Sequence, residues 1–289
     1  MAAPINWYPG HMNKARREIA KAMPKVNLII EVLDARIPFT SENPMVSELR
    51  GDTPCIKVLN KSDMADPVVT EAWMHHLEKE EGVTAMALNG LQPKRVKRLI
   101  PLGKSLLPAD RAQGKTITTM ILGIPNVGKS TIINTLAGRG IAKTGNKPAV
   151  TKIQQRIYIE HSFALLDTPG FLWPKLSPPS CGFKLAVTGA IRDAVVSFED
   201  LAFYAVAYLA EHYPEAIMAR YKLSALPEDE LGILEAIAAK RGCLARGGVV
   251  NLQKVSELFI REFRQCSIGR MSLETPAQIE AESRTLKVK

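Results

Sequence analysis

The sequence predicts an α/β domain, with a mostly parallel sheet covered by helices on both faces, followed by a small all-α domain. Two observations predict the first domain. Short apolar runs alternate with helical segments up to about residue 177, and one of these runs ends at a glycine-rich loop. A third observation predicts the second domain, because no convincing strand follows Pro174. We therefore expect one domain over 1–177 and another over 178–289.

Six segments of the first domain have the apolar runs or the pairing pattern of β-strands. They lie at 28–33, 55–59, 83–88, 116–122, 153–160 and 163–166. Helices are expected between them, at 66–81, 92–107 and 129–136. Asp66 can cap the first of these helices, with Pro67 at its first helical position. Strands that alternate with helices in this way favour a mostly parallel sheet.

The second domain has start signals for four helices. Ser197 or Asp200 opens a helix to about residue 212, and Asp229 caps another to about residue 241. Asn251 caps a third, to about residue 265, and Pro276 begins a last short one. A domain of about 110 residues built only from helices follows.

The positive charge of the chain is confined to the first domain. Residues 1–177 contain 24 Lys/Arg and 15 Asp/Glu, whereas residues 178–289 contain 14 of each, so the net charge of +9 belongs to the first part. Two basic clusters stand out: Lys14, Arg16, Arg17, Lys21 and Lys25, and then Lys94, Arg95, Lys97 and Arg98. Such clusters favour a polyanionic partner, although each could also be a solvated helix face.

The remaining composition points to a cytoplasmic protein without a membrane anchor. No apolar run approaches the ~18 residues that cross a bilayer. The first residues lack the basic-then-apolar order of a signal peptide. The four cysteines are scattered, which favours reduced thiols over a disulfide framework or a zinc site.

A phosphate-binding loop is predicted at Gly123-x4-Gly128-Lys129-Ser130, between a strand and a helix. The glycines let backbone N–H groups surround phosphate oxygens, and the helix N-terminus adds a favourable potential. Lys129 should reach the β- and γ-phosphates, and the Ser130 hydroxyl should hold Mg²⁺. The candidate phosphate-binding residues are Asn126, Val127, Gly128, Lys129, Ser130 and Thr131.

A guanine-reading motif is predicted at Asn60-Lys61-Ser62-Asp63, after the strand at 55–59. The Asp63 carboxylate would accept hydrogen bonds from guanine N1–H and N2–H₂, which adenine does not offer. The Lys61 stem can lie along the base plane, and Asn60 can steady the neighbouring loop. Asn89-Gly90 follows the next strand and would present a backbone N–H to guanine O6, although the same dipeptide is also a common turn.

The third nucleotide motif is Asp167-Thr168-Pro169-Gly170. Asp167 should bind Mg²⁺ through water, and the Gly170 N–H can meet the γ-phosphate. Thr151 is the candidate switch threonine that completes the metal shell, so the expected metal ligands are Ser130, Thr151 and Asp167. The residue that orients attacking water in Ras-like enzymes is a glutamine, but Phe171, Leu172 and Trp173 stand directly after Gly170 instead.

The order of these motifs is unusual. The guanine motif begins at residue 60 and the phosphate loop at residue 123, 63 residues later, whereas the common GTPase layout has the phosphate loop first. The three motifs together predict one GTP site in a circularly permuted GTPase domain.

The chain resembles the circularly permuted ribosome-assembly GTPases of the RbgA/YlqF type. Besides the nucleotide motifs and their order, the likeness includes Trp7-Tyr8-Pro9-Gly10-His11-Met12 and Asp34-Ala35-Arg36-Ile37-Pro38. In the second domain it includes Arg241-Gly242-Cys243-Leu244 with Gly247-Gly248. It therefore runs over almost the whole chain.

The resemblance implies a GTPase that binds a precursor of the large ribosomal subunit late in assembly, through rRNA and ribosomal proteins, and leaves after hydrolysing GTP. It implies a chain that is monomeric when free. It also implies that His11 is the catalytic or water-positioning group in place of the glutamine, and that Asn126 helps to hold K⁺ beside the phosphates. Two positions depart from the usual family pattern: Ala149 stands before Thr151 where the family has glycine, and Gly90 where relatives often have serine.

Two other function classes stay open at this point. A GTP-dependent regulatory or scaffold protein with a protein partner and negligible hydrolysis is compatible with the missing glutamine. A P-loop kinase or ATPase is disfavoured by Asp63.

Overall fold

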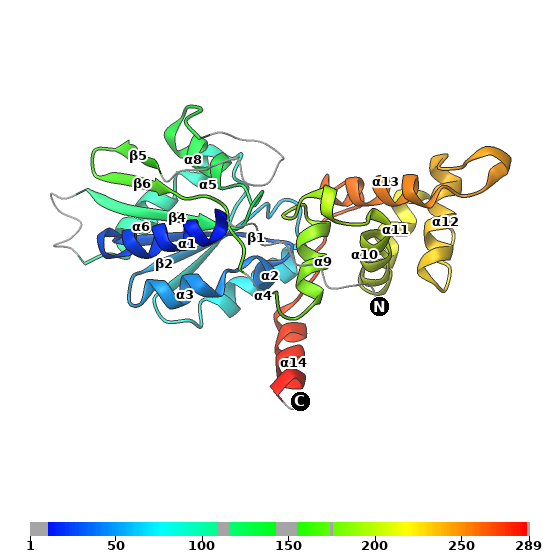
Figure 1. Ribbon diagram of the computed structural model, residues 1–289, viewed down its shortest axis with the longest axis horizontal. Helices are drawn as coiled ribbons and strands as arrows, with labels where there is room; N and C mark the ends of the chain where they lie inside the picture. The colour runs from blue at the N-terminus through cyan, green and yellow to red at the C-terminus, as the bar shows by residue number, and fades with distance from the viewer. Residues whose placement is uncertain (1–10, 109–115, 143–154, 174–175, 288–289) are drawn as a thin grey trace.

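The computed structural model describes residues 11–108, 116–142, 155–173 and 176–287, and it divides visibly into an α/β part and a helical part (Figure 1). The side chains of residues 11–16, 283 and 285–287 lie outside this description. Thr151 lies outside it altogether.

The α/β part is built on a six-stranded sheet with the order β3-β2-β1-β4-β6-β5. All neighbours pair in parallel except β5 and β6, which are antiparallel. The strands are β1 (Leu28–Asp34), β2 (Cys55–Asn60), β3 (Val83–Ala87), β4 (Ile117–Gly123), β5 (Gln155–Glu160) and β6 (Phe163–Asp167). The mostly parallel sheet expected from the sequence is therefore confirmed.

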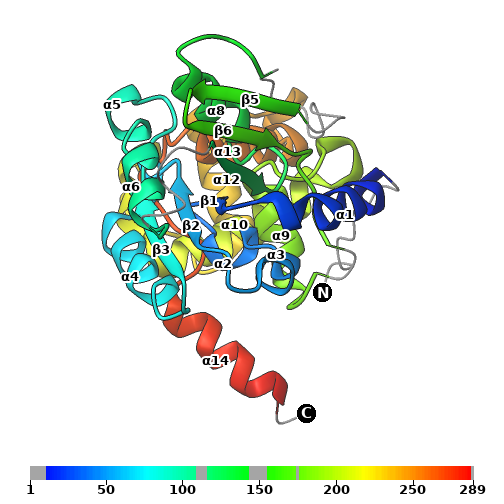
Figure 2. The ribbon, with the colours of Figure 1, turned by 90° about the vertical axis from the view of Figure 1, so that its left-hand side faces the viewer.

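Burial of the strands follows their place in the sheet. Every residue of β1, β2 and β4 is buried, as expected for central strands covered on both faces. Strand β5 lies at an edge, and four of its six residues are exposed. Figure 2 shows α5 and α6 on one face of the sheet and α1 and α3 on the other.

Seven helices belong to the described α/β part: α1 (His11–Ala22), α2 (Pro38–Ser41), α3 (Pro44–Arg50), α4 (Pro67–Leu77), α5 (Pro93–Val96), α6 (Leu99–Ser105) and α8 (Lys129–Ala137). The short 3-10 helix η1 (Met23–Lys25) follows α1. Asp66 caps α4 as expected, because its side chain accepts hydrogen bonds from the N–H groups of Val68 and Val69.

Two helix predictions were wrong in extent. The helix expected over 92–107 is broken at Lys97–Arg98 into α5 and α6. Pro101 has no N–H to donate to the Lys97 carbonyl one turn earlier, which accounts for the break. The helix expected over 66–81 ends at Leu77, because the following residues turn the chain toward β3 through Gly82, whose φ is +73°.

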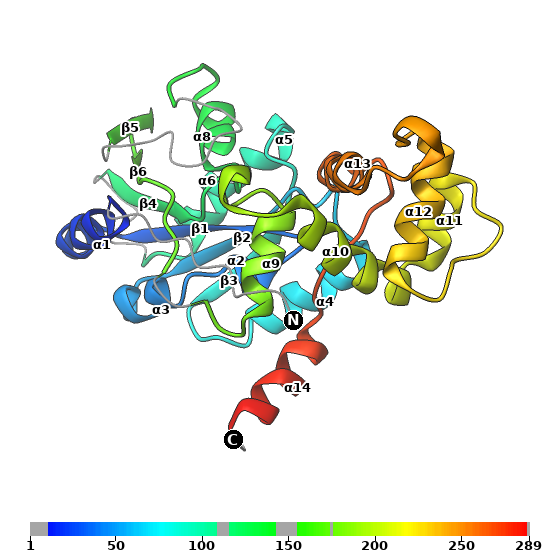
Figure 3. The ribbon, with the colours of Figure 1, turned by 45° about the vertical axis from the view of Figure 1, so that its right-hand side comes forward.

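The helical part follows: α9 (Ser180–Val187), α10 (Phe198–His212), α11 (Pro214–Tyr221), α12 (Glu230–Arg241), α13 (Leu252–Arg264) and α14 (Pro276–Lys287), with 3-10 helices η2 (Asp193–Val195) and η3 (Arg246–Gly248). Ser197, Asp229 and Asn251 cap α10, α12 and α13 with their side chains. Figure 3 shows α9 between the sheet and the bundle of α10 to α13. Helices α9 and α11 were not predicted from the sequence. None of the helices in the described part of the chain is long and apolar enough to cross a membrane.

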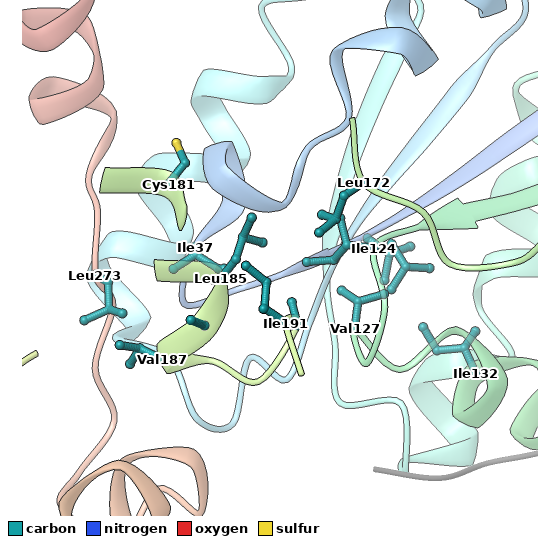
Figure 4. Packing of buried hydrophobic residues seen from close by; sticks show 14 of the residues in the cluster. Ile37, Ile124, Val127, Ile132, Leu172, Cys181, Leu185, Val187, Ile191 and Leu273 are labelled. Atoms are coloured by element: carbon teal, nitrogen blue, oxygen red, sulfur yellow. The ribbon is translucent and has the colours of Figure 1, made fainter. Parts of the chain in front are cut away.

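The two parts share one continuous apolar core. Figure 4 shows Ile124 and Val127 of the phosphate loop close to Leu185 and Ile191, which lie in α9 and just after it. The C-terminal helix α14 returns to the α/β part, where Ile279 joins the cluster around Leu33 and Trp73. The boundary at residue 177/178 stays a prediction.

A buried carboxylate also joins the two parts. Glu274 is fully buried, and its oxygens accept hydrogen bonds from the Thr40 N–H at 2.9 Å and from the Lys184 ammonium at 3.0 Å. Thr40 lies in α2 and Lys184 in α9. The segment before α14 is thereby tied to the loop after β1 and to the first helix of the helical part.

Candidate functional site

The candidate site lies where the carboxyl ends of the parallel strands meet. Strand β1 ends at Asp34, β2 at Asn60, β4 at Gly123 and β6 at Asp167. The chain runs from β1 to β2 and β3 on one side and then crosses to β4 on the other. The reversal of strand order between β1 and β4 creates the crevice where ligands bind in open α/β sheets.

The phosphate loop depends on two glycines. Gly123 has a φ of +150°, and an added Cβ would lie 2.5 Å from the Val32 carbonyl oxygen of β1. Gly128 has a φ of +102°, and an added Cβ would collide with the Asn60 side-chain amide. Larger residues at either position would displace the loop from its neighbours. The loop is therefore packed against both β1 and the end of β2.

Lys129 lies inside this loop and is 7% exposed. Its ammonium donates to the Gly123 carbonyl at 3.0 Å and contacts the Ile124 carbonyl at 3.4 Å. Burial lowers the pKa of Lys129 to about 8, against a smaller opposing effect of Asp167. Gly170 approaches closely enough that an added Cβ would be 3.1 Å from the Lys129 ammonium. The lysine is thus held where an anion could replace the loop carbonyls as its partner.

Asp167 meets the requirement for a metal-binding carboxylate. It is 2% exposed, and its Oδ1 atom is buried without a hydrogen-bond partner in the described part of the chain. Burial raises the pKa of Asp167, although Lys129 opposes that effect. The Thr168 hydroxyl donates to the Ile121 carbonyl at 2.8 Å and anchors the turn to β4. A buried carboxylate oxygen without a donor fits a hydrated Mg²⁺ ion.

Asn60 joins the guanine motif to the phosphate loop. It is 3% exposed; its amide nitrogen donates to the Val127 carbonyl at 2.8 Å, and its amide oxygen accepts from the Gly90 N–H at 2.8 Å. The Gly90 carbonyl in turn accepts from the Thr135 hydroxyl of α8 at 2.7 Å. One side chain therefore connects the three loops at the ends of β2, β3 and β4.

The rest of the guanine motif forms a short loop at the surface. Lys61 has a left-handed φ of +60°, Ser62 is half-buried, and Asp63 is exposed. No donor of the described chain forms a hydrogen bond to the Asp63 carboxylate. The Ser62 N–H donates to the Leu88 carbonyl at 3.2 Å, which holds the loop beside the end of β3. The loop leaves the Asp63 carboxylate available to a ligand.

The loop after β3 is an Asx turn. The Asn89 side chain accepts from the Leu91 N–H at 2.8 Å, and its carbonyl accepts from the Gln92 N–H at 2.9 Å. The Gly90 amide is occupied by Asn60. Among the amides of this dipeptide, the Asn89 N–H is therefore the better candidate donor to a base.

Asn126 connects the phosphate loop to the helical part. It has a left-handed φ of +57°, and its amide nitrogen donates to the Gly189 carbonyl at 2.8 Å. The preceding carbonyls at the end of α9, those of Ala186 and Val187, accept from Arg264 of α13 at 2.8 and 2.9 Å. The last carbonyls of α9 thus have a partner from α13, and the Gly189 carbonyl just after the helix has one from the phosphate loop.

The other candidates divide into placed and undescribed residues. Val127 is buried, whereas Ser130 and Thr131 are half-buried in the first turn of α8. His11 begins α1, and its side chain lies outside the described residues, as does the whole of Thr151. Phe171 and Leu172, which stand where a glutamine would follow Gly170, are 1% and 0% exposed. These two residues belong to the core and cannot orient water.

Three features of the site were missed in the sequence. Asp34 and Arg36 were recognised only as parts of a motif, without a role. Thr168 was named only as part of its motif, although its hydroxyl anchors the turn to β4. The Gly189 carbonyl has no side-chain signal at all, and the helix before it, which follows Pro178-Pro179, was not predicted.

Comparisons with known proteins agree over most of the chain. Residues 118–219 match the family described as "50S ribosome-binding GTPase". This match begins in β4, after the guanine motif. A relative from Priestia megaterium named "Ribosome biogenesis GTPase A" is 44% identical over 284 residues, which cover 96% of this chain and 98% of the relative. "Mitochondrial ribosome-associated GTPase 1" of Mus musculus is 31% identical, over 93% of this chain and 89% of its own length.

Two solved structures are similar over nearly the full chain. A GDP-bound structure of YlqF is 28% identical with a TM-score of 0.65, and it matches 90% of this chain and 100% of its own. The GNP-bound structure of YlqF from T. maritima is 28% identical with a TM-score of 0.64, and it matches 92% of this chain and 99% of its own. The fold predicted from the sequence is confirmed by this likeness.

Proposed function

The chain belongs to the ribosome biogenesis GTPase A family, and we propose that it acts on a late precursor of the large ribosomal subunit. It would bind GTP at the ends of β1, β2, β4 and β6 and hydrolyse it on that precursor. The proposal rests above all on Asn60. Its side chain hydrogen-bonds both the phosphate loop and the Asn89-Gly90 loop, so three separate motifs are held as one site. Chance matches to short motifs would not be connected in this way.

The guanine base would bind at the loop after β2. The exposed Asp63 carboxylate would accept from N1–H and N2–H₂, and the Lys61 stem would lie along the base plane. The Asn89 N–H would donate to O6. Asn60 and Ser62 hold this loop to its neighbours through the bonds described above.

The phosphates would bind the amides of the loop from Asn126 to Thr131, with Lys129 moving from the loop carbonyls to the phosphate oxygens. Mg²⁺ would neutralise charge that develops on these oxygens. Ser130, Asp167 and Thr151 would hold the ion, and the unpartnered Asp167 Oδ1 supports that assignment. Gly170 lies beside Lys129, where its N–H would donate a hydrogen bond to a γ-phosphate.

Hydrolysis needs a group that positions water, and Phe171 and Leu172 after Gly170 cannot supply it because they are buried and apolar. We assign this role to His11, on the strength of the family motif in which it stands. Asn126 would help to hold K⁺ beside the phosphates. Equal hydrolysis rates in KCl and NaCl would contradict the K⁺ assignment.

RNA would contact the basic surface of α5, defined by Lys94, Arg95, Lys97 and Arg98. All four are exposed, and no acid of the described chain forms an ion pair with them. Residues 88–108 contain five Lys/Arg and no Asp or Glu. The buried Val96 and Leu99 hold the segment to the apolar core, so the charges point outward. This surface follows directly after the Asn89-Gly90 loop, so RNA bound there would lie near the nucleotide base.

Sedimentation with purified large ribosomal subunits tests the proposal. The wild-type chain should co-sediment with a nonhydrolysable GTP analogue more than with GDP, and its affinity should fall steeply with salt. Lys94→Glu with Arg98→Glu should weaken this binding about tenfold or more. The matched control is Lys222→Glu with Lys240→Glu, two exposed lysines of the helical part.

The outcomes separate the function from the surface. Wild-type binding that is equal with both nucleotides, or absent, would favour a GTP-dependent scaffold with another partner. Nucleotide-dependent binding that is weakened equally by both double variants would keep the ribosomal partner and reject the α5 surface.

A further inference from the structure

A buried ion cluster lies directly behind the guanine loop. It consists of Asp34 and Arg36, at and after the end of β1, and Lys61 after the end of β2. The register of the sheet brings them together, since Asp34 pairs with Asn60 and the Ala35 N–H donates to the Asn60 carbonyl at 2.8 Å. The residue after Asn60 is the lysine of the guanine motif.

The Asp34 carboxylate is saturated with donors. Its Oδ2 accepts from the Lys61 ammonium at 2.8 Å and from Arg36 Nη2 at 2.8 Å. Its Oδ1 accepts from Arg36 Nε at 2.9 Å and from the Arg36 N–H at 3.1 Å. Burial alone would raise the pKa of Asp34, but Arg36 and Lys61 together hold it well below its ordinary range. Asp34 is therefore ionised at neutral pH.

Arg36 is buried against the helical part. It is 2% exposed, and its guanidinium lies over the Phe263 ring at 5.5 Å from the centroid. Its backbone carbonyl accepts from the Leu273 N–H at 2.8 Å. The arginine is thus fixed by the helical part and by the segment before α14, and it fixes Asp34 in turn.

Lys61 differs from its two partners because it reaches the surface. Its side chain is 23% exposed, whereas those of Asp34 and Arg36 are 3% and 2% exposed. Its left-handed backbone costs about 1–2 kcal/mol for a residue with a side chain, so the loop must be held in this conformation by its contacts. With its ammonium bound at Asp34, the aliphatic stem of Lys61 is held at both ends, by Asp34 and by the backbone of the loop that carries Asp63.

We propose that Asp34 is a positioning residue for guanine recognition, which holds the Lys61 ammonium and so sets the Lys61 stem against the plane of the base. The proposal rests on the guanine site proposed above. Asp34 has no contact of its own with the nucleotide; it acts through Lys61. The alternative is that the Asp34–Arg36 pair only stabilises the fold at the end of β1, and that the contact with Lys61 has no effect on nucleotide binding.

A double-mutant cycle separates these alternatives. GDP affinity is measured for the wild type, Asp34→Asn, Lys61→Met and the double variant, with the melting temperature of each. Asparagine keeps the size of Asp34 without its charge, and methionine keeps most of the Lys61 stem without the ammonium. We expect Asp34→Asn to weaken GDP binding about tenfold in the wild-type background and to change it less than twofold when Lys61 is methionine. In GTP turnover, KM should rise more than kcat falls.

Glu262→Gln is the matched control. Glu262 is also a buried carboxylate held by two arginines, Arg220 and Arg241, but it lies in α13 and has no contact with the guanine loop. It should lower the melting temperature and leave GDP affinity as in the wild type. If Asp34→Asn does not fold, Asp34→Glu takes its place in the same cycle, because a longer carboxylate displaces the ammonium without removing the charge.

If Asp34→Asn lowers GDP affinity equally in the wild type and in Lys61→Met, the proposal is overturned and Asp34 has only a structural role. Asp63→Asn distinguishes this result from failure of the guanine site itself. If Asp63→Asn leaves the preference for GDP over ADP unchanged, the guanine site is wrong. If it reduces that preference while the cycle is additive, only the role of Asp34 is wrong.

Discussion

Replacing Asn60 with alanine should weaken both the fold and nucleotide binding, because this side chain holds two loops together. The change leaves the Val127 carbonyl and the Gly90 N–H without their partner, and both residues are buried. Each buried group left unpaired costs about 1–3 kcal/mol. We expect a loss of about 2–4 kcal/mol in the free energy of unfolding, allowing for partial relaxation. A domain of ordinary stability would still fold.

Asn60→Ala should also weaken nucleotide binding by the folded protein. Without Asn60, the phosphate loop and the Asn89-Gly90 loop move independently, so a ligand that contacts both must order them on binding. We expect GDP affinity to fall at least about tenfold, equivalent to about 1.4 kcal/mol. Urea unfolding measures the first effect, and titration calorimetry with GDP measures the second.

Asn134→Ala provides the control, since Asn134 lies in the same helix as Lys129 but at its far end. It donates to the Ala142 carbonyl at 2.8 Å and accepts from the N–H groups of Ile141 and Ala142 at 2.9 and 2.7 Å. Its removal should cost about 1–2 kcal/mol of stability, because water can reach these partly buried groups, and leave GDP affinity unchanged. If Asn60→Ala lowers GDP affinity no more than Asn134→Ala does, the reasoning about coupled loops is refuted.

Two further predictions concern pH. The pKa of Lys129 is about 8 without ligand, and phosphate favours the charged form, so GDP affinity should fall by up to about tenfold per pH unit above pH 8. Calorimetry from pH 7 to 9 checks this slope, and a flat profile would mean that Lys129 keeps its charge. Glu31 is buried in β1, where burial and Glu42 raise its pKa to about 8, above its ordinary value of 4.5. The folded state therefore retains a proton that the unfolded state loses, and stability should fall as pH rises from 4.5 to 8. Glu31→Gln should remove this dependence and be more stable than the wild type at pH 9 but not at pH 5. Urea unfolding at both pH values measures the two free energies of unfolding; a difference between the proteins that is the same at pH 5 and pH 9 would contradict the prediction.

Much of the sheet could be predicted because its strands are short apolar runs with clear limits. All seven residues of β1 and of β4 are buried, and such runs leave few alternatives to a covered parallel strand. Caps at Asp66, Ser197, Asp229 and Asn251 were predicted for a similar reason. A short polar side chain just before a helical run accepts hydrogen bonds from the first N–H groups of that helix, so the signal is local in sequence.

Features that depend on distant partners could not be predicted. Glu274 has no local pattern that reveals its burial, because its partners Thr40 and Lys184 are 234 and 90 residues away. The break between α5 and α6 required weighing Pro101 against an otherwise helical segment. The link from Asn126 to the Gly189 carbonyl depends on the turn after α9, a helix that was not predicted from the sequence.

The candidate site shows the same division. The spacing of the motifs predicted which residues carry the nucleotide chemistry, because phosphate and guanine recognition need specific groups in a specific order. It did not predict that Asn60 is the shared hydrogen-bond partner of two loops, or that Asp34 holds Lys61. Those roles arise from strand register, which places the ends of β1 and β2 side by side.

The most direct test of the account is GTP hydrolysis with and without purified large ribosomal subunits, measured in KCl for the wild type and for His11→Ala. We predict strong stimulation of the wild type by the subunits, and loss of that stimulation in His11→Ala while GTP binding persists. Stimulation that survives in His11→Ala would keep the ribosomal partner and reject the role of the histidine. No stimulation of the wild type would contradict the central claim that this chain hydrolyses GTP on the large subunit.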